Sequence, residues 1–306
     1  MTTALITHSD CLNHVNPPGH PERVERLYAI NAALKNVSGL TRIEAPMGTD
    51  AQIATTHPAA YVERIKASAP ADGWTRLDGD TSMSPGSLTA AYRAVGGIVE
   101  AVDQVLAGNV RNAFVACRPP GHHAETQTPM GFCIFGNVVI GARHALVNGI
   151  SRLAIVDFDV HHGNGTQDLV WNDEMIFFVS THQMPLYPGT GLPSERGTHG
   201  NVMNVPLEPG ANGATLHKAM ERDILPALES YNPEMLFISA GFDAHERDPL
   251  ANLNWTDEDF GTVTRTLLDF ADTHCGGRVV STLEGGYDLK GLAGGVTAHV
   301  TALTEG

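Results

Sequence analysis

The sequence contains few cationic residues. Of its 306 residues, 19 are Lys or Arg and 34 are Asp or Glu, so the formal net charge at pH 7 is −15. Because no basic stripe is present, we expect no direct binding to nucleic acid, whereas a cationic substrate or partner would be attracted. The four cysteines, Cys11, Cys117, Cys133 and Cys275, are too few and too scattered for a disulfide framework or a CxxC zinc site.

Targeting segments and nucleotide-binding motifs are also missing. The first ten residues, MTTALITHSD, lack the basic start and apolar run of a secretory signal. No apolar stretch approaches the roughly 20 residues needed to span a bilayer. We therefore expect a cytoplasmic protein without membrane association. The sequence has no GxGxxG after a strand, no phosphate-binding GxxxxGK[ST] and no GxSxG nucleophile elbow.

What the sequence does contain is an alternation of short apolar runs and helical segments. With 42% apolar and 17% charged residues, the chain can build a hydrophobic core. Several runs are almost continuously apolar, such as LAIVDF and MLFISA, as is typical of strands covered on both faces. We predict strands over residues 3–7, 113–117, 153–157, 176–180, 202–206, 235–240 and 278–283.

Helices are predicted between these strands. One should start at Pro21, and others should cover residues 84–108, 137–148, 214–231 and 256–274, with a closing helix before Gly306. Thr256 and Asp259 have the spacing of a capping box. The alternation indicates an α/β fold in which helices flank a parallel sheet. We expect one domain over residues 1–306, with long surface loops at 70–86 and 182–201.

Four polar segments directly follow predicted strands. They are RPPGHHA (118–124), DFDVHHGNG (157–165), AGFDAH (240–245) and EGGY (284–287). In open parallel sheets, ligands bind outside the carboxyl ends of the strands. We therefore expect these segments to converge on one rim of the sheet.

The second and third segments predict a metal site. Asp159 and His161 are two residues apart, so on an extended segment they point the same way. With Asp243 from another strand end, they form a three-ligand O/N set that suits Zn²⁺ or Fe²⁺ with a coordination position left open. The alternative is a loop of capping Asp and surface His, which the repetition of polar strand ends disfavours.

The adjacent His122 and His123 suit proton transfer near neutral pH. Each needs a partner on its far nitrogen, and Asp157 can serve one and Asn164 the other. The alternative is a pair of structural histidines ending a Pro-Pro-Gly turn. A thiol nucleophile at Cys117 or Cys133 would leave the DxDxH segment without a role, so we interpret both as pocket-lining residues.

Aromatic residues complete the candidate site. Tyr287 could donate to a developing oxyanion, with the preceding glycines letting it swing into place, although most tyrosines are packing residues. Phe132, in Gly131-Phe132-Cys133, and Tyr187 could form the walls of an apolar slot or belong to the core.

In this order and spacing, the four segments closely resemble the histone deacetylase family of zinc amidohydrolases, from HVNPPGHPERVER (14–26) to Tyr287. Asn164 is more similar to the class II branch. The resemblance implies an arginase/deacetylase fold with a parallel sheet of about eight strands. It also implies zinc held by Asp159, His161 and Asp243, and structural K⁺ at a site matched by Asp157, Asp159, His161, Ser180 and Thr181.

The same resemblance assigns roles to the remaining site residues. His123 would be the general base, oriented by Asn164, and His122 the electrostatic or acid partner, oriented by Asp157. Tyr287 would polarise the amide carbonyl. Gly131, Phe132 and Tyr187 would flank the acyl-lysine tunnel, where Tyr187 stands in place of the more usual Phe.

Leu250 bears on the choice of substrate. Polyamine-selective eukaryotic relatives carry Glu after the Asp-Pro of Asp248-Pro249, and Leu250 has no carboxylate to pair with a second ammonium. We therefore expect a zinc-dependent deacylase of N-acyl-lysine. The alternatives are an acetylpolyamine amidohydrolase, a deacylase of another small acylated amine, an arginase-like hydrolase with two Mn ions and a non-catalytic acyl-amine-binding module. The sequence leaves the natural substrate open, and also whether the chain forms a homo-oligomer.

Overall fold

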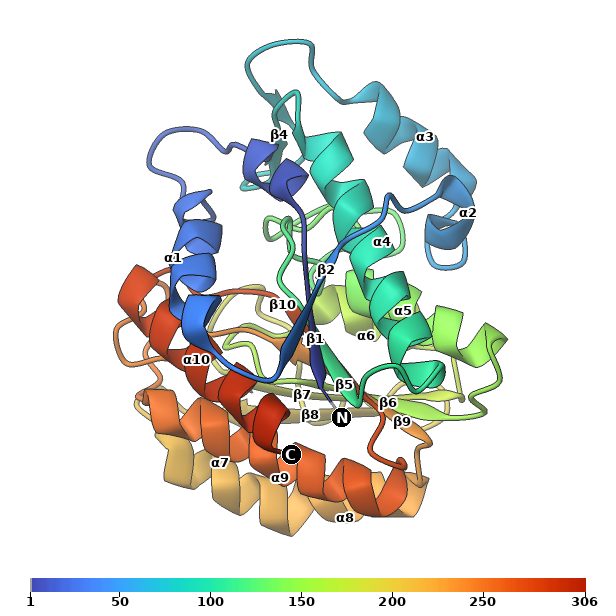
Figure 1. Cartoon of the computed structure of the whole chain (residues 1–306), viewed down its shortest axis with the longest axis vertical. Helices are drawn as coiled ribbons and strands as arrows, with labels where there is room; N and C mark the ends of the chain where they lie inside the picture. Colours follow the sequence, from blue (N-terminus) through green and yellow to red (C-terminus); the bar gives the residue numbers. More distant parts are fainter. Residues whose placement is uncertain (1) are drawn as a thin grey trace.

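The computed structural model describes residues 2–306, and within them eight parallel strands form one central sheet (Figure 1). Their order is β2-β1-β5-β10-β9-β6-β7-β8, and β3 and β4 form a separate antiparallel hairpin. The strands are β1 (Thr3–Thr7), β2 (Leu40–Glu44), β3 (Thr75–Arg76), β4 (Ser82–Met83), β5 (Asn112–Val115), β6 (Leu153–Asp157), β7 (Ile176–Gln183), β8 (Val202–Leu207), β9 (Met235–Ala240) and β10 (Val279–Leu283).

Helices cover both faces of this sheet. Those described are α1 (Glu25–Ala33), α2 (Asp50–Ile53), α3 (Ala59–Ala67), α4 (Ser87–Leu106), α5 (Asn137–Val147), α6 (Asn164–Val170), α7 (Gly213–Ala219), α8 (Leu225–Tyr231), α9 (Asp257–His274) and α10 (Leu289–Glu305). The long helices α4 and α5 pack on one face, and Figure 1 shows α9 and α10 on the other. No helix in residues 2–306 is long and apolar enough to cross a membrane.

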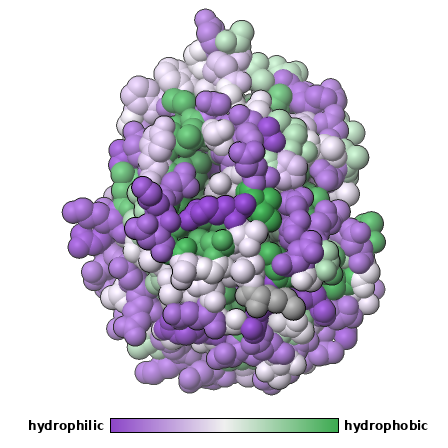
Figure 2. Space-filling view, viewed as in Figure 1, coloured by the Kyte–Doolittle hydropathy of each residue, from purple (hydrophilic) through white to green (hydrophobic). Residues whose placement is uncertain are grey.

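Every predicted strand is present, and the near-continuous apolar runs are the fully buried central strands β6, β7 and β9. The edge strand β2 was not predicted, because its residues LTRIE are mostly half-buried or exposed and give no strong apolar run. The segment 70–86 contains the short β3–β4 hairpin rather than only loop. The face shown in Figure 2 is mainly hydrophilic, with apolar patches between the polar residues.

The helix predictions hold except at one start and in one interior. The helix expected from Pro21 begins at Glu25, because the main chain before it is held by side chains: Asn16 donates to the Glu22 carbonyl. The predicted helix over 214–231 is interrupted by a π turn at Met220–Ile224, just before Pro226, whose nitrogen cannot donate to the helix. The capping box of Thr256 and Asp259 is confirmed.

A buried ionic cluster joins the amino-terminal segment to the sheet. The carboxylate of Glu22 accepts from Arg118 Nη2 at 2.5 Å, from Arg26 Nη1 at 3.0 Å and from Asn16 Nδ2 at 2.8 Å. Glu22, Arg26 and Arg118 are all fully buried. Burial raises the pKa of Glu22, but the charge of Arg118 and the hydrogen bond from His14 outweigh it and hold the pKa well below its usual value. The carboxylate is therefore the counter-ion of two buried guanidinium groups.

Replacing this carboxylate should destabilise the fold strongly. Glu22→Gln leaves Arg26 and Arg118 buried without a counter-ion, and we expect a loss of about 3–5 kcal/mol in the free energy of unfolding. Urea denaturation of Glu22→Gln and of the exposed control Glu229→Gln measures this loss.

The effect should depend on pH in a defined direction. Because folding lowers the pKa of Glu22, its contribution is complete above the unfolded carboxyl pKa of about 4.3 and is lost as the pH falls through the folded value. The difference between Glu22→Gln and the wild type should therefore shrink under acidic conditions. A Glu22→Gln variant as stable as Glu229→Gln at pH 7 would contradict the role of the cluster.

Candidate active site

The four polar segments come from four strands that are neighbours in the sheet. Their order is β5-β10-β9-β6, and the register aligns their carboxyl ends: Leu283 pairs with Ala240, and Asp157 pairs with Ser239. The segments after these strands therefore leave the sheet side by side. This arrangement brings together the residues that were predicted from widely separated parts of the sequence.

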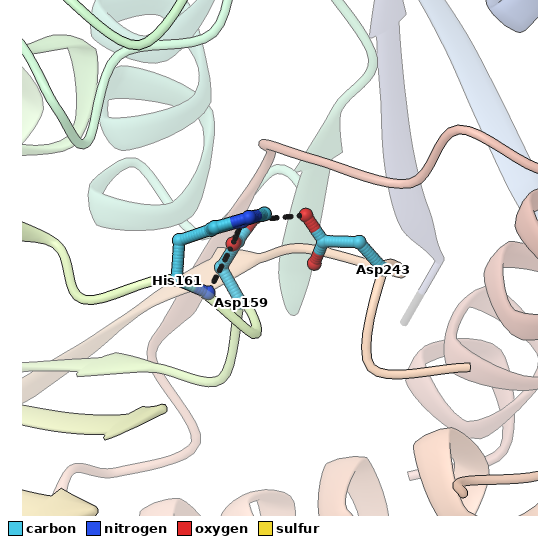
Figure 3. Close-up of side chains that lie close together, drawn as sticks. All are labelled: Asp159, His161 and Asp243. Carbon is cyan, nitrogen blue, oxygen red and sulfur yellow. Dashed lines mark hydrogen bonds and ion pairs between the residues drawn. The ribbon is translucent and has the colours of Figure 1, made fainter. Parts of the chain in front are cut away.

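Asp159, His161 and Asp243 face one another at this rim (Figure 3). His161 Nδ1 lies 3.1 Å from Asp159 Oδ1 and 3.1 Å from Asp243 Oδ2. One ligand atom from each residue lies within 4.8 Å of the others, and all three side chains are buried. Two buried carboxylates and one imidazole are a donor set that fits Zn²⁺. The residues present therefore suit a divalent cation.

The main chain holds the two carboxylates in place. Asp159 accepts from Gly285 N at 2.8 Å, and Asp243 accepts from Val160 N at 3.0 Å. Burial lowers the pKa of His161, but its hydrogen bonds and Coulombic attraction to both carboxylates outweigh burial and raise the pKa to about 10. Burial and the charge of Asp159 raise the pKa of Asp243. The concentrated negative charge thus favours any cation placed between the carboxylates.

Gly285 owes its place to this close packing. A Cβ at residue 285 would lie 2.1 Å from Asp243 Oδ2 and 2.6 Å from Asp159 Oδ2. Any other residue would push the two carboxylates aside. The glycine pair of EGGY, predicted to let Tyr287 swing, here provides the room that the ligand set requires.

His122 and His123 lie beside the ligand set with different partners. His122 Nδ1 is 2.9 Å from Asp157 Oδ2, and His123 Nδ1 is 2.7 Å from Asn164 Oδ1. The two ring centroids are 4.0 Å apart. These are the pairings that the family resemblance implied.

The two imidazoles titrate in opposite directions. Burial lowers the pKa of both, but the charges of Asp159 and Asp157 outweigh burial at His122 and raise its pKa well above the usual value. At His123, repulsion from His122 and His161 adds to burial, so its pKa lies well below the usual value. The surroundings therefore favour the protonated form of His122 and the neutral form of His123.

Glu284 is a site residue to which the sequence analysis gave no role. Its Oε2 accepts from Gly121 N at 2.7 Å and from His122 N at 3.1 Å, so it holds the main chain that carries the histidine pair. Burial raises its pKa to about 7, while the charge of His122 acts in the opposite sense. The signal was available: a carboxylate directly after the apolar strand RVVSTL is buried at the strand end.

Aromatic rings flank the histidines. Tyr287 meets Phe132 edge-on at 5.8 Å, and Tyr187 meets His123 edge-on at 5.2 Å between centroids. Tyr187 is 39% exposed, which places it at the mouth of the site. Gly131 lies against His123, because a Cβ there would be 2.3 Å from the imidazole. The structure thus brings the predicted slot residues around the histidine pair.

The walls around these rings are fixed by the turn at 78–81. Asp80 Oδ1 accepts from Gly131 N at 3.0 Å, and Thr81 Oγ1 accepts from Phe132 N at 3.0 Å. Next to Tyr287, a cavity of about 570 Å³ is lined by Pro249, Trp74, His20 and the Pro17–Pro18 segment. Leu250 is half-buried, and its N–H donates to Asp248 Oδ1. The turn at 78–81 and Asp248 were not recognised from the sequence.

The chain is similar to proteins of known family. The histone deacetylase domain model matches residues 20–303. A probable deacetylase of Archaeoglobus fulgidus is 36% identical over 95% of this chain and 83% of its own length. A histone deacetylase-like amidohydrolase of Pseudomonas aeruginosa is 39% identical over 89% of this chain and 74% of its own length.

The structural comparison agrees. The crystal structure of the HDA15 HD domain superposes with a TM-score of 0.94 and 31% identity, covering 99% of this chain and 88% of that one. The single α/β domain with its eight-stranded parallel sheet therefore has the arginase/deacetylase fold. The chain belongs to the histone deacetylase family of deacetylases and amidohydrolases.

Proposed function

We propose that this protein is a zinc-dependent amidohydrolase that removes an acetyl or short acyl group from an N-acylated amine, with N-acyl-lysine as the preferred substrate. One observation carries the proposal: the buried set of Asp159, His161 and Asp243 lies beside two histidines with different partners, His122 on Asp157 and His123 on Asn164. We infer that His123 is the neutral base and His122 the cationic partner. A divalent cation, a general base and a general acid are together sufficient to hydrolyse an unactivated amide.

Zinc held by Asp159, His161 and Asp243 would polarise the scissile carbonyl and acidify a water molecule. His123 accepts the proton from the attacking water, since its imidazole is neutral and its Nδ1 is oriented by Asn164. His122 remains cationic beside Asp157 and stabilises the negative charge that develops in the site. The proton collected by His123 then goes to the departing amine.

Tyr287 supplies a hydrogen-bond donor to the carbonyl oxygen. Burial, together with the charges of Asp243 and Asp159, raises the pKa of its phenol well above the usual value. The phenol therefore stays protonated over the working pH range of the histidines. A donor fixed before the reaction stabilises an oxyanion without reorganisation at the moment of attack.

The slot and its rim favour an acyl-lysine substrate. Phe132 and Tyr187 give the approach to His123 an apolar lining that suits a straight alkyl chain. Leu250 provides no carboxylate for the second ammonium of a polyamine. An acylated lysine carries its next charge farther away, in the peptide, where the acidic surface of the protein can attract it.

We further propose a structural K⁺ beside the zinc ligands. Asp157 pairs with Ser180 across β6 and β7, and Thr181 Oγ1 lies 3.4 Å from the main-chain oxygen of Asp157. These oxygens, close to the turn with Asp159 and His161, form the kind of environment that a hard cation prefers. Such an ion would stiffen the turn that carries two of the zinc ligands.

Substrate preference is tested by turnover of the zinc-loaded protein on three compounds: an acetyl-lysine peptide, acetylputrescine and a small acetylated alkylamine. We expect the highest kcat/KM on the peptide, because Leu250 replaces the carboxylate that a polyamine would need. Faster hydrolysis of acetylputrescine would show instead that the protein is an acetylpolyamine amidohydrolase. Failure to hydrolyse any acylated amine would overturn the proposed function.

Metal content is tested by elemental analysis after loading. We expect one zinc ion per chain, and its loss in His161→Ala and Asp243→Ala, because each variant removes one of three ligands. The control His144→Ala changes a histidine of α5 that lies outside the ligand set and should retain the ion. Two ions per chain would instead support an arginase-like site.

The role of Tyr287 is tested by Tyr287→Phe. Loss of the phenolic donor should lower kcat about 10²–10³-fold and change KM little, because the donor acts on the developing oxyanion. The exposed Tyr28→Phe provides the matched control. Unchanged turnover of Tyr287→Phe with bound zinc would refute the assignment.

A further inference from the structure

Asp248 is a buried carboxylate that reaches across to the Tyr287 segment. It lies between the metal ligand Asp243 and Leu250 along the chain and is 8% exposed. No cationic side chain in residues 2–306 forms an ion pair with it; its hydrogen bonds come from main-chain N–H groups. A buried carboxylate costs free energy unless its oxygens are satisfied, so this arrangement needs an explanation.

The hydrogen bonds of Asp248 are of two kinds. Oδ1 accepts from Leu250 N at 3.0 Å, which is the ordinary local bond of an Asp turn. Oδ2 accepts from Tyr287 N at 2.6 Å and from Asp288 N at 3.3 Å, which join the segment after β9 to the segment after β10. The local turn explains the first bond only. The second set fixes the main chain of Tyr287.

The other side of the Tyr287 segment is held by Arg26. Its Nε donates to Gly286 O at 2.7 Å, and its Nη2 donates to Glu284 O at 2.5 Å. The guanidinium also lies over the Tyr287 ring, 5.1 Å from the centroid. The segment is thus bound through its carbonyls by the Arg26 guanidinium and through its N–H groups by the Asp248 carboxyl group. Arg26 bonds to the carbonyls of Glu284 and Gly286, whereas Asp248 bonds to the N–H of Tyr287 itself.

Asp248 also links Tyr287 to a second residue that lines the neighbouring cavity. Tyr287 and Pro249 both line the cavity of about 570 Å³, and Pro249 lies in the turn that Asp248 closes with Leu250. A shift of the carboxylate would therefore move the phenol and Pro249 together.

We propose that Asp248 is a positioning residue that sets the place of the Tyr287 phenol relative to the metal ligands. The inference rests on the proposed function, in which Tyr287 donates to the carbonyl oxygen. Asp248 itself touches neither substrate nor metal in this scheme. It acts only through the backbone of Tyr287, so its effect on turnover should disappear when the Tyr287 hydroxyl is absent. A general contribution to stability would not depend on that hydroxyl.

The test is a double-mutant cycle between Asp248→Asn and Tyr287→Phe. Asn offers one acceptor oxygen in place of two, so it cannot satisfy both Leu250 N and Tyr287 N. We expect kcat on the acetyl-lysine peptide to fall at least about tenfold in Asp248→Asn with KM little changed, since small misplacements of a catalytic group cost one to two orders of magnitude. In the Tyr287→Phe background, the same change should lower kcat less than about twofold.

Controls separate positioning from loss of structure. Asp173→Asn changes another aspartate whose Oδ1 accepts from the N–H two residues on, away from the site, and should leave kcat unchanged. Zinc content should be unchanged in both variants. If Asp248→Asn does not fold, Asp248→Glu keeps the charge, displaces the carboxylate and gives the same comparison. Equal losses of kcat with and without the Tyr287 hydroxyl would overturn the proposal.

A second measurement does not depend on turnover. The chain has six tyrosines, so the protein labelled with 3-fluorotyrosine should give a ¹⁹F resonance for Tyr287 that is identified by its absence in Tyr287→Phe. This resonance should shift or broaden in Asp248→Asn and stay unchanged in Asp173→Asn. An unchanged resonance in Asp248→Asn would overturn the positioning role. Inactivity of the wild type on every acylated amine would overturn the proposed function, while the ¹⁹F comparison would still decide whether Asp248 positions Tyr287.

Discussion

The mutual repulsion of two buried carboxylates is the constraint on which the rest of the site depends. Asp159 and Asp243 are fully buried, and both face His161 within hydrogen-bonding distance. Such a pair is stable only where main-chain N–H groups and a cation compensate the charge. The segments that follow β6 and β10 supply the N–H groups, from Val160 and Gly285. The pairing of β6 with β9 brings the two carboxylates to the same rim, and the glycine at 285 allows their close approach. In the proposed function, a divalent cation would supply the remaining charge.

The same negative charge distinguishes the two neighbouring histidines. His122 lies near Asp157 and Asp159, whose charges favour its cationic form, whereas His123 has the neutral Asn164 as its partner and His122 beside it. The pKa values of two identical side chains, adjacent in sequence, are therefore shifted in opposite directions. Exchanging the partner of His123 for a carboxylate would reduce that difference, which explains why an amide at 164 matters to the chemistry.

The sequence was sufficient for the sheet and for the residues at its rim, because both depend on local signals. Apolar runs marked the central strands, and polar residues directly after them marked the site. Three kinds of feature gave no such signal. The edge strand β2 is too exposed to give an apolar run. The helix begins at Glu25 rather than at Pro21, and just before it Asn16 donates to the Glu22 carbonyl. Asp248 accepts a hydrogen bond from Tyr287 N, 39 residues farther along the chain. Contacts of this kind depend on the assembled fold and leave no periodic pattern.

Tyr287 shows how such long-range contacts change a functional interpretation. The glycines before it suggested a mobile phenol, yet in the structure its backbone is bound by Asp248, its preceding carbonyls by Arg26, and its ring lies between Arg26 and Phe132. A mobile donor would lose conformational entropy each time it engaged an oxyanion, whereas a fixed donor has lost it already on folding. Arg26 and Asp248 hold this segment in place, so less reorganisation of Tyr287 is needed during the reaction. The cost is the desolvation of these two buried polar side chains on folding.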